Sequence, residues 1–288
     1  MKKEKKIKSD LTIEDMPHNR LQVFFDVIKV RWDILLYIGL ILFLFFIPLI
    51  IALFTENIFV SNLYGLFVNG NINEETYRIN LFQTNLIFTL IESIAILLIA
   101  LPLSGIIRIY RLLCFYEGII FFRDLFKGIK DNIKQVVVVF IIDVLLFIAT
   151  KLSINYLIAS GNNDFINTFI FFLPAFLFGI LILPISLLHI LQVAIYNNKY
   201  FENVKNSFVL YFKSGFTSFG VTLLLFSPLF LFFINAIYTP IILLSLYALL
   251  FIPLAVLFAF LHANWVFDKY INKSQYPEIF DKGIYRNK

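Results

Sequence analysis

The chain has 288 residues, of which 60% are hydrophobic and 15% are charged, and its mean hydropathy is +0.86. Soluble domains average roughly 45–50% apolar and about 25% charged residues, so this composition excludes a water-soluble protein. A single cysteine, Cys114, excludes a disulfide framework and a cysteine-built metal site, and the three histidines lie far apart in sequence. The net charge of +5 comes from cations that flank the apolar segments on one side, so no nucleic-acid partner is expected.

Six apolar segments reach the length of about 20 residues that a membrane-spanning helix needs. They predict an all-α polytopic membrane protein: a domain at 20–263 with six transmembrane helices in one bundle, a basic N-terminal tail at 1–19 and a C-terminal tail at 264–288. The lipid bilayer is therefore the first expected partner. The predicted spans are 34–54, 81–104, 136–159, 168–191, 216–236 and 241–261.

The basic residues lie almost entirely on one side of this topology. Of the 24 Lys and Arg residues, 22 fall before the first span, in the connections 105–135 and 192–215, and after the last span, and the exceptions are Arg78 and Lys151. By the positive-inside rule, both termini are expected in the cytoplasm of a multi-pass cell-membrane protein. The first apolar run is too long for a signal peptide, so we expect it to be an uncleaved span.

The connections between spans differ in length. Residues 55–80 are expected to form an outer loop, whereas 160–167 and 237–240 are short enough to join antiparallel helical hairpins. The phrases around Pro102, Pro184 and Pro253 are similar and indicate a threefold hairpin repeat, with chance similarity as the alternative. Because proline removes a backbone donor, the helices are expected to kink there, either as transporter hinges or as bundle geometry.

Three stretches beside the spans, 20–33, 122–135 and 201–211, have helical periodicity with two unlike faces. Helices of this type lie in the headgroup plane with the apolar face toward the lipid, so all three are expected as cytoplasmic surface helices. In 122–135 the basic face serves either as a lipid surface or as a surface for a partner protein. The basic residues of that face are Arg123, Lys127, Lys130 and Lys134.

Four ionisable residues fall inside predicted spans: Glu92, Asp143, Lys151 and His189. A charge at the bilayer centre costs about 2.5–3.5 kcal/mol, so each is expected to be paired, neutral or in contact with water. At 1.5 Å per residue, Glu92 lies about 16 Å and Lys151 about 12 Å from the outer ends of their spans, which predicts an ion pair. A hydrogen bond between Asp143 and His189 is also compatible with their depths. These groups either fasten helices together or form a proton or solute path.

Catalytic and nucleotide-binding motifs are missing from the chain. It has no G-x-x-x-x-G-K-[ST], no H-E-x-x-H and no G-x-S-x-G sequence, so we expect no enzyme activity, no metal and no cofactor. Cys114 is interpreted as a small apolar residue or an acylation site.

Four stretches of the chain resemble the YesL-like family of bacterial membrane proteins of unknown function. They are RLQVFFDVIKVRWD (20–33), FRDLFKGIKDNIKQ (122–135), NSFVL (206–210) and YPEIFDKGIY (276–285), and Ile133 departs from the expected aromatic residue. The resemblance implies a multi-span helical protein, often encoded beside carbohydrate ABC uptake systems, and it supplies no catalytic residues.

Two functions are compatible with these features. The first is a non-catalytic accessory or regulatory subunit of a carbohydrate uptake system, in which 122–135 contacts ABC-type transporter subunits. The second is an autonomous small-solute transporter that uses the intramembrane charges.

Overall fold

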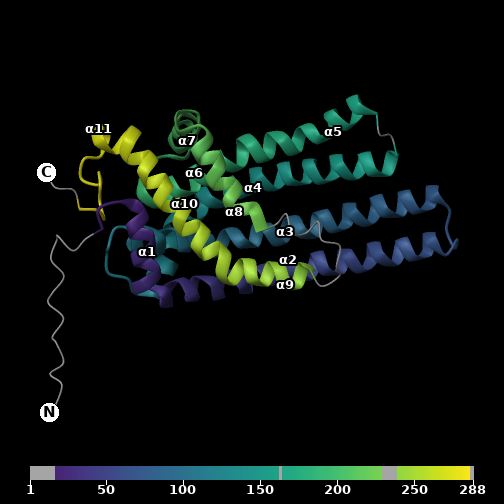
Figure 1. The fold of residues 1–288 in the computed structure, drawn as a ribbon, viewed down its shortest axis with the longest axis horizontal. Helices are drawn as coiled ribbons and strands as arrows, with labels where there is room; N and C mark the ends of the chain where they lie inside the picture. The colour runs from purple at the N-terminus through teal and green to yellow at the C-terminus, as the bar shows by residue number, and fades with distance from the viewer. Residues whose placement is uncertain (1–16, 162–163, 229–238, 286–288) are drawn as a thin grey trace, which may run out of the picture.

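The computed structural model describes residues 17–161, 164–228 and 239–285, and within these ranges the chain is helical and contains no strand (Figure 1). The expected all-α membrane fold is thus confirmed. In chain order the segments are α1 (Arg20–Val30), α2 (Trp32–Val68), α3 (Glu74–Cys114), α4 (Phe121–Ser160), α5 (Phe165–Phe176), η2 (Leu177–Ile182), α6 (Leu183–Ile195), α7 (Tyr200–Ser214), α8 (Phe216–Phe226), α9 (Thr239–Leu246), η4 (Tyr247–Phe251), α10 (Ile252–Phe267), η5 (Asp268–Asn272) and α11 (Lys273–Gln275).

Five continuous helical stretches are long and apolar enough to cross a membrane, and each contains one of the predicted spans. They are Trp32–Val68, Glu74–Cys114, Phe121–Ser160, Phe165–Ile195 and Ile241–Gln275. A sixth is present if α7 and α8, which meet at an angle of 101°, are counted as one broken span. The predicted span 216–236 begins at the first residue of α8, and its part beyond 228 lies outside the described residues.

The long helices have two distinct ends, which we call the terminal end and the hairpin end. At the terminal end the backbone N–H of Tyr285 donates to the carbonyl of Pro17 at 2.8 Å, so the two ends of the described chain meet there. At the hairpin end α2 turns into α3 and α4 turns into α5 (Figure 1). Among the described basic residues, all except Arg78 and Lys151 belong to segments of the terminal end.

The connection 55–80, expected as an outer loop, is instead helical along most of its length. Helix α2 continues to Val68 and α3 begins at Glu74, with a tight turn between them. The side chain of Asn73 caps α3 by accepting from the backbone N–H of Thr76 at 2.7 Å, which satisfies one of the free donors of the first turn. The prediction was wrong because the two helices continue to pack beyond the spans through aromatic rings: Tyr77 of α3 stacks on Phe67 of α2, with 4.9 Å between the centroids, and also contacts Tyr64.

The stretch 122–135, expected as a separate surface helix, is also different. It forms the first turns of α4, which runs unbroken from Phe121 to Ser160 and is about 60 Å long at 1.5 Å per residue. Gly128 lets this segment approach α3 closely: a Cβ on Gly128 would lie 2.9 Å from the Cα of Gly105. The segment is therefore part of the α3–α4 contact and not a separate helix.

Helices α1 and α7 do run across the ends of the long helices, as expected for surface helices (Figure 1). In α7, however, the buried side is polar, with Asn203 and Ser207 fully enclosed, whereas Phe201 and Phe212 on the opposite side are exposed. An exposed apolar face and a buried polar face fit a helix that has lipid outside and a hydrogen-bonded network inside.

Two of the three proline phrases are preceded by a π-helical turn, which widens the helix where proline interrupts the backbone hydrogen bonds. Pro184 has no N–H to offer the carbonyl of Ile180, and that carbonyl accepts a hydrogen bond from the Tyr211 hydroxyl at 2.5 Å. Pro102, by contrast, lies within the unbroken helix α3. The predicted kinks thus occur as π turns in the second and third phrases.

At the third phrase, the carbonyl that proline leaves free packs against a glycine, where the second phrase has a tyrosine hydroxyl. The carbonyl of Leu249, four residues before Pro253, approaches α2 so closely that a Cβ on Gly39 would lie 2.1 Å from its oxygen. The carbonyl of Pro253 itself accepts from the buried hydroxyl of Tyr110 at 2.7 Å. These contacts join α2, α3 and α10 in the terminal half of the bundle, where the largest fully buried side chains, including Phe260 and Phe267, form the core.

A single methyl group at Gly39 tests this close approach. Gly39→Ala is expected to lower stability by about 1–3 kcal/mol, since the helices must move apart. The matched control is Gly65→Ala in the same helix, where no atom lies within 4 Å of the added Cβ. Thermal unfolding in detergent measures both variants. Equal midpoints would contradict the close packing of α2 on the Leu249 carbonyl.

Candidate functional site

The intramembrane charges form a cluster of three side chains from three helices. The Nζ of Lys151 on α4 lies 2.7 Å from Oε2 of Glu92 on α3, so the expected ion pair is confirmed. It also lies 2.9 and 3.0 Å from the two carboxylate oxygens of Glu56 on α2. The cluster therefore ties α2, α3 and α4 together at one level of the bundle.

Glu56 was not among the predicted site residues. It lies two residues beyond the predicted end of the first span, in the segment that was expected to be a loop. The signal in the sequence is that Glu56 is the first charged residue after Asp33, so a carboxylate ends an uncharged run of 22 residues. Only the extension of α2 to Val68 brings it opposite Lys151.

One ammonium faces two carboxyl groups in this cluster, so the cluster contains one acidic group more than its cation can neutralise. Glu92 is 1% exposed, and its second oxygen, Oε1, is buried without a hydrogen-bond partner in the described part of the chain. An unpaired polar atom in a low-dielectric interior is costly. The cluster therefore holds three helices together, and a proton or a small cation bound there would neutralise the extra acidic group.

Further hydrogen bonds made by asparagine side chains lie along the same interface, between α3 and α4. The amide of Asn85 donates to the Oδ1 of Asn155 at 3.3 Å, and Asn132 donates to the carbonyl of Ser104 at 3.0 Å. These contacts lie on either side of the cluster, and together they fix the register of α3 against α4.

His189 is buried and Asp143 is partly buried, and each has other neighbours than expected. Asp143 on α4 accepts from the hydroxyl of Ser186 on α6 at 2.7 Å. The ring of His189 packs at a tilt against Tyr200 with 5.0 Å between centroids, and its Nε2 has no partner among the described residues. The proposed Asp143 to His189 hydrogen bond is thus replaced by a bond to Ser186, one turn earlier on α6.

The four basic residues of the 122–135 stretch share one exposed side of α4. Arg123 is 65% exposed and lies 3.8 Å from Asp124, and no ion pair involving Lys127, Lys130 or Lys134 occurs within the described ranges. Phe122 and Phe126 are on the same side and are 62% and 66% exposed. We name these six residues the docking face: Phe122, Arg123, Phe126, Lys127, Lys130 and Lys134.

A buried polar network closes the terminal end. The guanidinium of Arg20 donates to Asp268 at 2.6 Å and to the carbonyl of Lys282 at 2.7 Å, which joins α1 to η5 and to the last described turn. Asp268 also accepts from Asn272 at 2.7 Å, and Asn272 accepts from the hydroxyl of Tyr196. Burial, with the nearby charge of Asp268, raises the pKa of Tyr196 above its usual range, so this hydroxyl remains a donor.

Comparison with known proteins returns no match: no family model fits the chain, and neither the curated proteins nor the solved structures contain a similar one. The resemblance to the YesL-like family stays a prediction. No group of three or more His, Cys, Asp and Glu side chains that could hold a metal ion occurs in residues 17–161, 164–228 and 239–285. Function must therefore be argued from the surfaces and charges themselves.

The charge cluster predicts an order of destabilisation. Lys151→Met leaves two carboxylates facing each other without a cation, and we expect a loss of about 3–5 kcal/mol. Glu92→Gln leaves Lys151 paired with Glu56, so its loss is expected to be smaller. The variant with both substitutions should recover part of the loss of Lys151→Met. Thermal unfolding in detergent micelles gives the three values.

The control for this cycle is Glu74→Gln, which breaks an exposed ion pair with Arg78 at the hairpin end. Exposed pairs contribute about 0–1 kcal/mol, so this variant is expected to unfold close to the wild type. If Lys151→Met were as mild as the control, the cluster would not hold the three helices together.

Cys114 provides a reporter of folding at the terminal end. Its thiol is fully buried, which does not fit an acylation site and agrees with its interpretation as a small apolar residue. We expect a maleimide reagent to leave the folded protein unlabelled and to label it once in denaturant, as measured by mass. Rapid labelling of the folded protein would contradict the packing of this region.

Proposed function

We propose that the protein is a non-catalytic accessory or regulatory membrane subunit, with both termini in the cytoplasm, that binds a partner protein through the docking face. The carrying observation is that Phe122 and Phe126 are exposed on the segment of α4 that precedes the uncharged span beginning at Val136. The one-sided distribution of basic residues supports the orientation through the positive-inside rule.

The depth of the docking face follows from helix geometry. Phe126 lies ten residues and Phe122 fourteen residues before Val136, where the uncharged span begins, and these separations correspond to about 15 and 21 Å. The headgroup layer adds only about 5–8 Å to each side of the hydrocarbon core. Since α4 is unbroken from Phe121 to Ser160, these separations place both phenyl rings outside the hydrocarbon core and Phe122 beyond the headgroup layer, where it requires another cover.

The chemistry of this face fits a protein partner with an apolar centre and an acidic rim. Two neighbouring aromatic rings can supply the buried anchor of an interface, and the four surrounding cations favour a partner of opposite charge. The resemblance to the YesL-like family favours the permease or ATPase subunits of a carbohydrate uptake system as this partner, because such systems are often encoded nearby.

A second candidate is a small-solute carrier, which is favoured by the surplus carboxylate of the Lys151 cluster. In that case protein in liposomes would conduct protons or a cation, and Glu92→Gln would abolish the flux while leaving the docking face intact. The accessory function predicts no flux from the protein alone. Liposome measurements and partner recovery therefore separate the two candidates.

Charge reversal tests the docking face. We expect Lys127→Glu with Lys130→Glu to reduce recovery of the partner at least tenfold in affinity purification from native membranes in mild detergent. The expected partners, quantified by mass spectrometry, are transport permease or ATPase subunits in near-stoichiometric amount. The matched control, Lys29→Glu with Lys205→Glu, makes the same charge change at exposed positions of α1 and α7. Membrane insertion of both variants is verified by alkaline extraction.

Two outcomes would overturn the proposal. One is recovery of the same partner at the same level from the docking-face variant and from the control. The other is a protein that purifies without any partner and supports flux in liposomes, which would assign the function to the charge cluster.

A further inference from the structure

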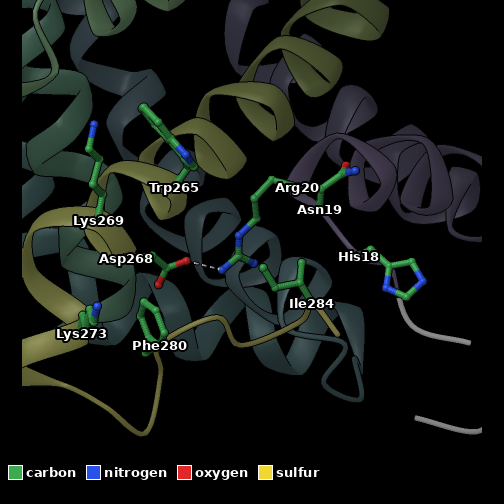
Figure 2. Close-up of a pocket in the computed structure, with 9 residues that line it drawn as sticks. All are labelled: His18, Asn19, Arg20, Trp265, Asp268, Lys269, Lys273, Phe280 and Ile284. Atoms are coloured by element: carbon green, nitrogen blue, oxygen red, sulfur yellow. Dashed lines mark hydrogen bonds and ion pairs between the residues drawn. The ribbon is translucent and has the colours of Figure 1, made fainter. Parts of the chain in front are cut away.

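Two adjoining cavities form a groove between α1 and the end of α10, away from the docking face. The larger, of about 470 Å³, lies at the terminal end, and Figure 2 shows the side chains that surround it. The smaller, of about 170 Å³, lies toward the span and is lined by Leu21, Phe24, Phe258 and Leu261 with His262 at its side. Both cavities share Arg20 and Trp265 as walls, so one groove passes from apolar to basic surroundings.

The larger cavity carries unneutralised positive charge. Arg20 is paired with Asp268, as the dashed line in Figure 2 shows, but Lys269 and Lys273 have no ion-pair partner in the described part of the chain. The side chain of Arg20 is 10% exposed, and its Nε is buried without a hydrogen-bond partner. The terminal nitrogens of Arg20 are already bonded to Asp268 and to the carbonyl of Lys282, so the free positive charges of the cavity are the two lysines.

The end of α1 adds to the attraction for an anion. Asn19 caps this helix by accepting from the backbone N–H of Gln22 at 2.8 Å, and both Asn19 and His18 line the larger cavity. The N-terminus of a helix carries a partial positive charge and is a common position for phosphate groups. In Figure 2 the start of α1 and the two lysines lie on opposite sides of Arg20, so the helix end and the lysines attract an anion at different parts of the groove.

The depth of the groove indicates where the ligand comes from. Trp265 is 42% exposed and lies four residues beyond the predicted end of its span, as is typical of tryptophan at the boundary between hydrocarbon and headgroups. Lys269 lies over the Trp265 ring, with its Nζ 5.2 Å from the centroid. Apolar residues are found on the span side of this tryptophan and cations on the other, which is the order of the parts of a phospholipid.

We infer that the groove binds one anionic phospholipid, with its phosphate near Lys269 and Lys273 and an acyl chain against Leu21, Phe24 and Phe258. The volume of the larger cavity is within the range of about 300–1,000 Å³ that small-ligand sites occupy. This site is independent of the docking face and goes beyond the proposed function. It would make the packing of α1 against α10 sensitive to the lipid composition of the membrane.

The chain contains two tryptophans, which permits a direct test. In Trp32→Phe protein only Trp265 fluoresces, and phosphatidylglycerol with brominated acyl chains is added at a low fraction to phosphatidylcholine vesicles. We expect stronger quenching than by brominated phosphatidylcholine at the same fraction. Lys269→Gln with Lys273→Gln in this background should weaken the apparent affinity for the anionic lipid about 10- to 30-fold, at about 1 kcal/mol per cation.

The matched control is Lys29→Gln with Lys205→Gln, which removes the same charge elsewhere at the terminal end and should change the affinity less than twofold. Folding of each variant is verified by the inaccessibility of Cys114 to maleimide. Equal quenching by the two lipids, or unchanged affinity in the Lys269 and Lys273 variant, would overturn the inference. Displacement of the brominated lipid by inorganic phosphate would assign the site to a soluble phosphate compound and likewise overturn it.

Discussion

The antiparallel contact of α3 with α4 is the interaction on which the rest of the structure depends. It runs from Asn85 and Asn155 near the hairpin end, through Glu92 and Lys151, to the glycines at 105 and 128 near the terminal end. In a bilayer the lipid chains are as apolar as the side chains, so apolar surface alone does not hold two helices together. Polar pairs and close glycine contact supply the specificity that burial cannot, and α2 and α6 attach to this pair through Glu56 and Ser186.

The proline phrases of the fourth and last long helices provide a second kind of contact between helices. Each π turn frees a carbonyl, and a group from another helix approaches the freed oxygen: the hydroxyl of Tyr211 at Ile180 and the bare backbone of Gly39 at Leu249. Such irregularities are tolerated inside a membrane only where the freed groups face protein. The kinks therefore act here as helix contacts, in keeping with bundle geometry.

The terminal end is the most elaborate part of the molecule, since both ends of the described chain, the Arg20 network, the docking face and the lipid groove are all located there. The groove and the docking face are formed by different helices, α1 with α10 and α4, and each presents cations that lack partners within the described residues.

The sequence by itself determined the solvent, the positions of the apolar spans and the pair of Glu92 with Lys151. Hydropathy and the rise per residue depend only on the local sequence. Counting residues from the end of each span is therefore sufficient to show that Glu92 and Lys151 lie at similar depths in the membrane. It could not determine that 55–80 is helical, that 122–135 continues into α4, or that Glu56 joins Lys151. Those outcomes depend on which helix faces are neighbours, and an amphipathic stretch has the same periodicity whether lipid or protein covers it. Only the tertiary structure decided that the apolar side of α7 points outward. Its polar side is occupied by hydrogen bonds with other helices: Ser207 accepts from Gln192, and Asn203 donates to Gln135.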